Sequence, residues 1–106
     1  MSDILNDLYK IVEQRKAERE EGSYTVYLFD EGLDKILKKL GEETAETIIA
    51  AKNAESGGEE AKEALIGEVS DLIYHLVVML NKLGVKPPEI ESLLRERMQK
   101  QRNLKT

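Results

Sequence analysis

The apolar residues of the chain recur at helical spacing in four stretches, which predicts four main helices. The first includes Ile4 and Val12, and the fourth opens at Pro87. The second runs over about residues 34–54 and the third over about 60–83. Short turns between helices are typical of an all-α helical bundle. The length of 106 residues fits one domain, residues 1–106.

One segment interrupts the helical pattern. Residues 23–29 read SYTVYLF, are rich in β-branched and aromatic residues, and lie between Gly22 and Gly32. This composition is typical of a strand. Because the chain offers no second strand to pair with it, we expect an extended loop here.

The third predicted helix is apolar nearly all round between Leu72 and Leu80, with only Tyr74 and His75 as interruptions. A helix without a polar face has to be covered on several sides. A chain this short has little with which to cover it, so we expect a homodimeric bundle. We expect His75 to be a satisfied core or interface residue, with a direct role in a site as the alternative.

Charge and composition exclude several classes of function. The net charge of -5 argues against nucleic-acid binding through a basic surface, and the absence of cysteine excludes thiol chemistry. The run LIYHLVVML is too short to span a bilayer, and the first residues show no secretion signal, so we expect a cytoplasmic protein without membrane contact. To bind an anionic substrate, an acidic protein of this kind would need a local positive element such as lysines or a metal ion.

Two acidic pairs stand out by their position. The pattern ExxE or ExxD is common here and alone predicts little, but one pair borders the apolar stripe of the second helix and the other adjoins the apolar run of the third. Glu46 and Glu68 lie equally far along the chain from Gly57, as do Glu43 and Asp71. If the two helices fold back antiparallel, all four carboxylates reach the same level and repel one another. A hard cation, Mg²⁺ or Mn²⁺, would relieve this repulsion, so we predict a metal site.

The two acidic pairs and the segments around them resemble the sequences of a known group of enzymes. GEETAE followed by EVSD resembles the EExxE…ExxD motif of the all-α nucleotide pyrophosphohydrolases, which include MazG-like enzymes and dimeric dUTPases. The segments SYTVYLF, GLDKILKKLGEE, AAKN and DLIYHLVVML are most similar to the phosphoribosyl-ATP pyrophosphatase family, up to about Leu94. The acidic motif indicates the superfamily, and the segments before it narrow the resemblance to this branch.

The resemblance implies Mg²⁺-dependent hydrolysis of phosphoribosyl-ATP to phosphoribosyl-AMP and pyrophosphate by a homodimer, the second step of histidine biosynthesis. It implies metal ligation and catalysis by four acids: Glu43, Glu46, Glu68 and Asp71. It makes Glu42 a candidate for activating water, and it assigns phosphate contacts to Lys38 and Lys39 and a substrate loop to Ser23, Tyr24 and Thr25.

Two other functions stay open at this point. A house-cleaning nucleoside triphosphate pyrophosphatase of the same superfamily would share the acids and differ in the substrate loop. A non-catalytic helical dimer that binds a partner through an apolar face would leave the acids solvated, and it would show no response to Mg²⁺.

Overall fold

The computed structural model describes residues 3–100, which form five α-helices and no strand. They are α1 (Ile4–Glu18), α2 (Tyr24–Glu31), α3 (Leu33–Ala54), α4 (Glu59–Lys82) and α5 (Pro87–Lys100). The expected all-α class is therefore confirmed. In the described part of the chain, no helix is both long and apolar enough to cross a membrane.

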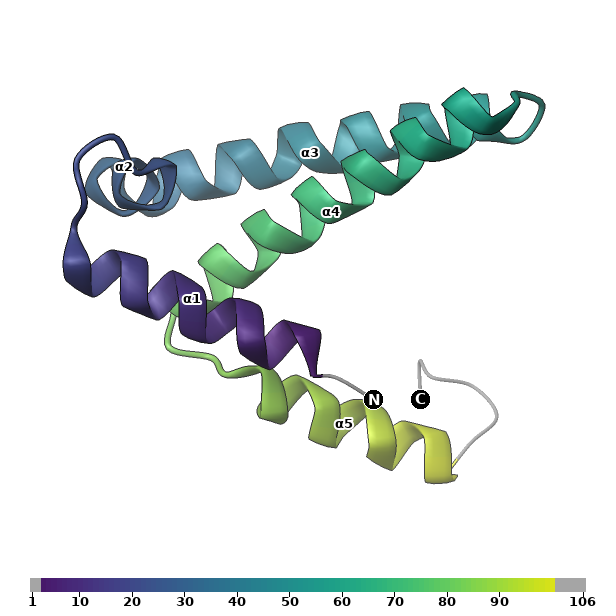
Figure 1. Ribbon diagram of the computed structural model, residues 1–106. Coiled ribbons are helices and arrows are strands. Elements are labelled where there is room, and N and C mark those ends of the chain that lie inside the picture. Colours follow the sequence, from purple (N-terminus) through teal and green to yellow (C-terminus); the bar gives the residue numbers. More distant parts are fainter. Residues whose placement is uncertain (1–2, 101–106) are drawn as a thin grey trace.

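The two longest helices, α3 and α4, form an antiparallel hairpin with the most extensive packing in the molecule (Figure 1). The turn between them is tight at Gly57, where an added Cβ would lie 2.8 Å from the carbonyl oxygen of Asn53. Away from this turn the two helices diverge, and α1 lies against α4 with α5 beside it (Figure 1). The hairpin sets the register on which the acidic site depends.

The segment expected to be an extended loop is a helix, so that prediction is wrong. Ser23 caps α2 by accepting a hydrogen bond from the Val26 N–H at 3.3 Å. Thr25 and Leu28, three residues apart, are almost fully buried and form the inner face of α2. Burial of this face outweighs the weak helix propensity of β-branched and aromatic residues. The helix ends at Gly32, whose φ of 96° disfavours other residues.

The apolar core lies at the open end of the hairpin, where four helices meet. Its buried members are Tyr9 and Val12 of α1, Leu28 of α2, Ile36 of α3, and Val77 and Val78 of α4. Val77 and Val78 are at most 1% exposed within the single chain. The argument that the apolar run of α4 needs a second chain is therefore wrong for these two valines, because the other helices already cover them.

Apolar side chains remain uncovered farther along the hairpin. Ile48 and Ile49 of α3 are 65% and 61% exposed, and Ile66 of α4 is 57% exposed. Single exposed apolar residues are normal, but several large ones on neighbouring helices indicate a contact surface. The large exposed apolar side chains therefore lie on the outer surface of the hairpin and not on the core-facing part of α4.

Candidate metal centre and active site

The structure brings three of the predicted acids together across the hairpin. Glu43 of α3 and Glu68 and Asp71 of α4 each offer an oxygen atom, and these oxygens lie within 4.8 Å of one another. Glu68 and Asp71 share a face of α4 because they are three residues apart. The Thr47 hydroxyl donates to the Glu43 carbonyl oxygen at 2.8 Å and lies 3.2 Å from that of Glu68, so the helix backbones approach closely at this level.

Glu43 occupies the centre of the buried face of α3. The buried residues of this helix are Ile36, Glu43 and Ala50, spaced a heptad apart. The sequence pattern predicts Glu43 at the border of an apolar stripe, whereas the structure puts it in the middle of the face that packs on α4. A charged residue at such a position is rare unless a partner satisfies it.

The Glu43 carboxylate lacks such a partner among the described residues. The side chain is 8% exposed, and its Oε2 atom is buried without a hydrogen bond. Burial raises the pKa of Glu43, and the negative charge of Glu46 raises it further, while His75 acts in the opposite direction. Leaving a buried polar group unsatisfied costs about 1–3 kcal/mol. The missing partner fits a bound cation, and carboxylate oxygens are the ligands that hard divalent cations prefer.

Glu46 lies beside the three clustered acids and outside their tight group. Its side chain is exposed, and its carboxyl group forms a hydrogen bond with that of Glu68. Burial is the main cause that raises the pKa of Glu68, followed by this hydrogen bond and by the negative charges of Glu46, Glu43 and Asp71. A cation held by these acids would offset the mutual repulsion that raises the pKa of Glu68.

The predicted phosphate-binding lysines lie on α3, one turn before the acids. Lys39 forms a 3.1 Å ion pair with Glu42, and this hydrogen bond lowers the pKa of Glu42 and raises that of Lys39. Both side chains are partly exposed to water, 32% for Lys39 and 44% for Glu42, so the pair adds little stability. Lys38 is exposed and adds positive charge near Glu42. Glu42, expected to activate water, is therefore held by Lys39 at the edge of the cluster.

The three residues of the expected substrate loop differ in their surroundings. Ser23 caps α2, and Thr25 is 1% exposed with its hydroxyl bonded to the Tyr74 hydroxyl, so both side chains support the structure. Tyr24 is 43% exposed. Burial of part of the ring raises its pKa, and the positive charge of Lys39 works against that rise. Of the three, only Tyr24 is exposed, and its ring lies near the charged Lys39.

His75 joins Tyr24 to the acidic site. The ring is 5% exposed, with Nδ1 2.7 Å from the Asp71 carbonyl oxygen and Nε2 2.9 Å from the Tyr24 hydroxyl. The expectation of a satisfied core residue is confirmed. Both partners of this ring, Tyr24 and Asp71, are residues of the candidate site, which the sequence pattern does not predict. The available signal was its spacing, since His75 follows Asp71 by one helical turn.

One open hollow borders the acids, and a second one lies beside Tyr24. The first, of about 580 Å³, runs along the hairpin and has Glu46 and Glu68 in its wall. The second, of about 400 Å³, lies at the turn between α1 and α2 and is lined by Arg15, Ser23, Tyr24 and Tyr74, among others. Both volumes fall in the range of small-molecule sites.

The fold and the site together define a class of protein: an all-α helical protein whose central hairpin gathers carboxylates suited to a hard divalent cation. The family model described as phosphoribosyl-ATP pyrophosphohydrolase matches residues 5–98 of the chain. The chain therefore belongs to this family, which confirms the resemblance noted in the sequence.

Curated relatives agree with the family model. A phosphoribosyl-ATP pyrophosphatase from Streptococcus thermophilus is 50% identical over 101 residues, which cover 95% of this chain and 91% of the relative. The protein of the same name from Clostridium acetobutylicum is 49% identical over 104 residues, covering 98% and 89%. The one from Listeria monocytogenes is 52% identical over 94 residues, covering 89% and 84%.

Proposed function

We propose that this chain hydrolyses phosphoribosyl-ATP to phosphoribosyl-AMP and pyrophosphate, as the second step of histidine biosynthesis. Membership of the phosphoribosyl-ATP pyrophosphohydrolase family supports this reaction. The structural observation that carries the proposal is the buried, unpartnered oxygen of Glu43 inside a cluster of carboxylates. Such a group is costly in a purely structural role and useful for binding a cation that holds a polyphosphate.

The proposed cofactor is Mg²⁺, with Mn²⁺ as a substitute. Glu43, Glu68 and Asp71 would hold it, with Glu46 beside them as a fourth carboxylate. When bound, the ion supplies positive charge that neutralises phosphate oxygens and orients an attacking water. The chain itself offers carboxylate oxygens and no cysteine, which suits a hard cation and disfavours a thiophilic one.

The other residues of the site handle charge and protons. The chain carries a net charge of -5, which opposes the approach of an anionic substrate. Lys38 and Lys39 provide local positive charge at the entrance to the acids. When a phosphate group attracts Lys39, the ion pair with Glu42 opens, and the Glu42 carboxylate becomes free to accept a proton from water.

We also propose that the active protein is a homodimer that packs through the outer face of the hairpin. On α3, Leu37, Thr44, Ile48 and Ala51 are all exposed and recur at helical spacing. These residues belong to the apolar stripe that the sequence pattern predicts for this helix, and the chain leaves them uncovered, whereas Ile36 of the same stripe is buried in the core. Packing against a second copy would bury it as one seam of a helical bundle.

The function is tested by incubating the purified protein with phosphoribosyl-ATP and Mg²⁺ and separating the products. Formation of phosphoribosyl-AMP and pyrophosphate is the expected result. Direct release of orthophosphate in assays free of added pyrophosphatase would contradict cleavage between the α and β phosphorus atoms. Faster turnover of canonical or modified nucleoside triphosphates would favour the house-cleaning alternative, and no turnover and no Mg²⁺ response would favour a non-catalytic role.

A further inference from the structure

The hollow along the hairpin continues from the acids toward the turn at Gly57. Its volume is about 580 Å³, and Glu46 of α3 and Glu68 of α4 lie in its wall. Farther from the acids the wall consists mainly of small or apolar side chains of both helices: Ile49, Ala50, Ala61 and Ala64. The acids therefore border this hollow directly, so a ligand held by them can extend into it.

One side of α3 passes from positive charge to the acids and then to the hollow. Lys39, Glu42, Glu46, Ile49 and Asn53 recur at spacings of three or four residues, so they share this side of the helix. Lys39 and Asn53 lie on opposite sides of Glu46 along the helix, each about 10 Å from it at 1.5 Å per residue. The stretch from Glu46 to Asn53 is thus comparable with the length of a nucleoside monophosphate. Phosphates held by Lys39 and the acids would place a base near Ile49 and Asn53.

The wall of the hollow suits a base and does not suit a phosphate. Its charged members are Glu46, Glu60 and Glu68, and none of the described residues that line it is a lysine or an arginine. A phosphate inside would therefore be repelled. Ile49 is 61% exposed, so a flat aromatic ring would cover apolar surface that the chain leaves in water. An apolar wall with a few polar groups is typical of small-molecule sites.

Asn53 is the neutral polar side chain in this wall. It is exposed, and its amide forms no hydrogen bond with another residue in the described part of the chain. An asparagine amide offers a donor and an acceptor side by side. This pair matches the N7 acceptor and the 6-amino donor of adenine, a pairing that asparagine also makes with adenine in DNA. Hypoxanthine presents two acceptors, N7 and O6, at the same edge, so one of the two hydrogen bonds would be lost.

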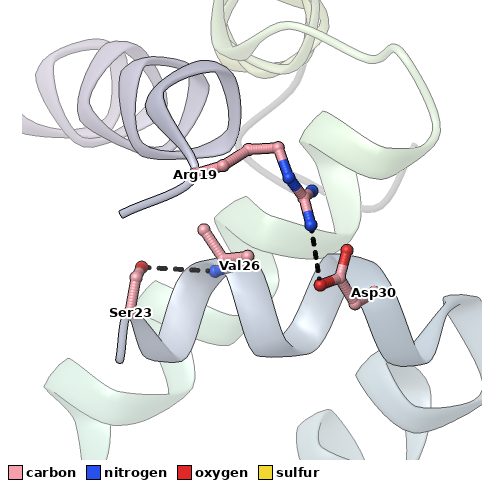
Figure 2. Close-up of polar contacts among 4 residues, drawn as sticks. All are labelled: Arg19, Ser23, Val26 and Asp30. Carbon is pink, nitrogen blue, oxygen red and sulfur yellow. Dashed lines mark hydrogen bonds and ion pairs between the residues drawn. The ribbon is translucent and has the colours of Figure 1, made fainter. Parts of the chain in front are cut away.

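The hollow beside Tyr24 offers less to a base. Figure 2 shows that the hydroxyl of Ser23, which lines this hollow, accepts from the Val26 N–H at 3.3 Å. It also shows Arg19, close by in the chain, donating to the Asp30 carboxylate at 2.9 Å. These polar groups hold the connection between α1 and α2 in place, whereas the amide in the hairpin hollow is free for a ligand.

On the basis of the hydrolase activity proposed above, we propose that the hairpin hollow is the subsite for the purine base of the substrate and that Asn53 determines the preference for adenine. The base covers Ile49 and the small side chains of α4, and its N7 and 6-amino edge faces Asn53. Ile48 points to nearly the opposite side of α3, because successive residues are about 100° apart. The proposed dimer seam therefore leaves the subsite open.

The first test fills the hollow and compares the binding of AMP and of pyrophosphate, each with Mg²⁺, by titration calorimetry. Ala64→Leu enlarges an exposed side chain of the wall and should weaken AMP binding at least about fivefold, the effect of an overfilled site, while pyrophosphate affinity stays within about twofold. Ala45→Leu, an exposed alanine of α3 outside the wall, is the matched control and should bind both ligands as the wild type does. Unchanged AMP affinity in Ala64→Leu, or equal losses for both ligands, would overturn the proposal.

The second test concerns the choice of base. The wild type should bind AMP more tightly than IMP by roughly 2- to 10-fold, the effect of one neutral hydrogen bond. Asn53→Leu keeps a side chain of similar size and removes both polar groups, so it should bind AMP and IMP equally. Pyrophosphate affinity should not change, which shows that the fold and the acids are intact. A wild type without this preference, or a variant that keeps it, would refute the role of Asn53.

Kinetics with phosphoribosyl-ATP separate this inference from the proposed function. Ala64→Leu and Asn53→Leu should raise KM by about the same factor as the loss in AMP affinity, with kcat within about twofold of the wild type. If the wild type hydrolyses phosphoribosyl-ATP and both variants behave like it, the inference fails and the function stands. If the wild type does not hydrolyse it, the function fails, and the AMP, IMP and pyrophosphate titrations still decide whether the hollow binds a base.

Discussion

Glu43→Gln should be more stable than the wild type without metal and less stable than the wild type with Mg²⁺. With a chelator at about pH 8, the variant loses a buried charge whose Oε2 has no partner, and the new amide can donate to the neighbouring carboxylates. Removing an unsatisfied buried group is worth about 1–3 kcal/mol. Each kcal/mol raises Tm by roughly 4–8 °C for a domain near this size. The apo variant should therefore melt above the apo wild type.

Adding Mg²⁺ should invert this order. At a free concentration one hundred times its Kd, a ligand that binds only the folded state adds about 2.7 kcal/mol. For the wild type this corresponds to a rise in Tm on the order of 10 °C. Glu43→Gln lacks the ligand charge and should gain much less at the same Mg²⁺ concentration, so the wild type should then melt higher. Differential scanning calorimetry with chelator and with Mg²⁺ measures both conditions.

The control is Glu63→Gln, a change of an exposed acid on α4 outside the cluster, which should leave both melting temperatures unchanged. The reasoning about Glu43 is refuted if Glu43→Gln melts below the wild type in chelator, because the buried carboxylate would then be satisfied. It is also refuted if the variant shows the full Mg²⁺ response, because a cation would then bind elsewhere.

Three further predictions follow from the same contacts. The pKa of Glu43 is raised above its usual value of 4.5, so the folded apo protein binds the proton of the Glu43 carboxyl group more tightly than the unfolded chain does. Protonation of Glu43 therefore stabilises the fold, and this stabilisation is lost as the pH rises through the raised pKa. The Tm difference between Glu43→Gln and the wild type in chelator should therefore be near zero at about pH 4 and grow toward pH 8. Asp71→Asn changes an exposed acid, so apo stability should be nearly unchanged while Mg²⁺-dependent turnover of phosphoribosyl-ATP falls at least about 100-fold; retained turnover would remove Asp71 from the site. Ile48→Asp should yield a folded monomer by analytical ultracentrifugation, whereas Val77→Asp should unfold the chain, because only Val77 is buried in the core; a dimeric Ile48→Asp would place the interface elsewhere.

The register of the acidic site was predictable because it depends on counting along two helices. In an antiparallel hairpin each residue advances 1.5 Å along its own helix, so residues equally far from the turn reach the same level. The turn at Gly57 is tight, and Glu43, Glu68 and Asp71 meet as expected. The position of Glu46 was not predictable in this way, because counting fixes a level along the axis and leaves the rotation of each helix open.

The helical state of residues 24–31 could not be predicted from local composition. Thr25, Val26 and the aromatic residues around them favour a strand in isolation. Their helix depends on two features whose effect is tertiary: a face buried against the core and side-chain bonds to α4 such as that between Tyr24 and His75. The cap at Ser23 and the glycine at position 32 were visible in the sequence, but each is also compatible with a loop.

Helix α3 explains why we expect a second chain at the outer surface of the hairpin and not at the apolar run of α4. Leu37 and Ile48 of α3 are 42% and 65% exposed, while Ile36 and Glu43 of the same helix are buried. A single chain that buried the apolar stripe would gain more from hydrophobic burial and would leave Glu43 in water. In the structure α3 is turned about its axis so that Glu43 faces α4 and Leu37 and Ile48 face outward. This orientation leaves apolar side chains in water and buries a carboxylate. A cation bound to Glu43 would offset the buried charge, and a second chain over Leu37 and Ile48 would offset the exposed apolar surface. Metal binding and dimerisation should therefore stabilise the same orientation of α3.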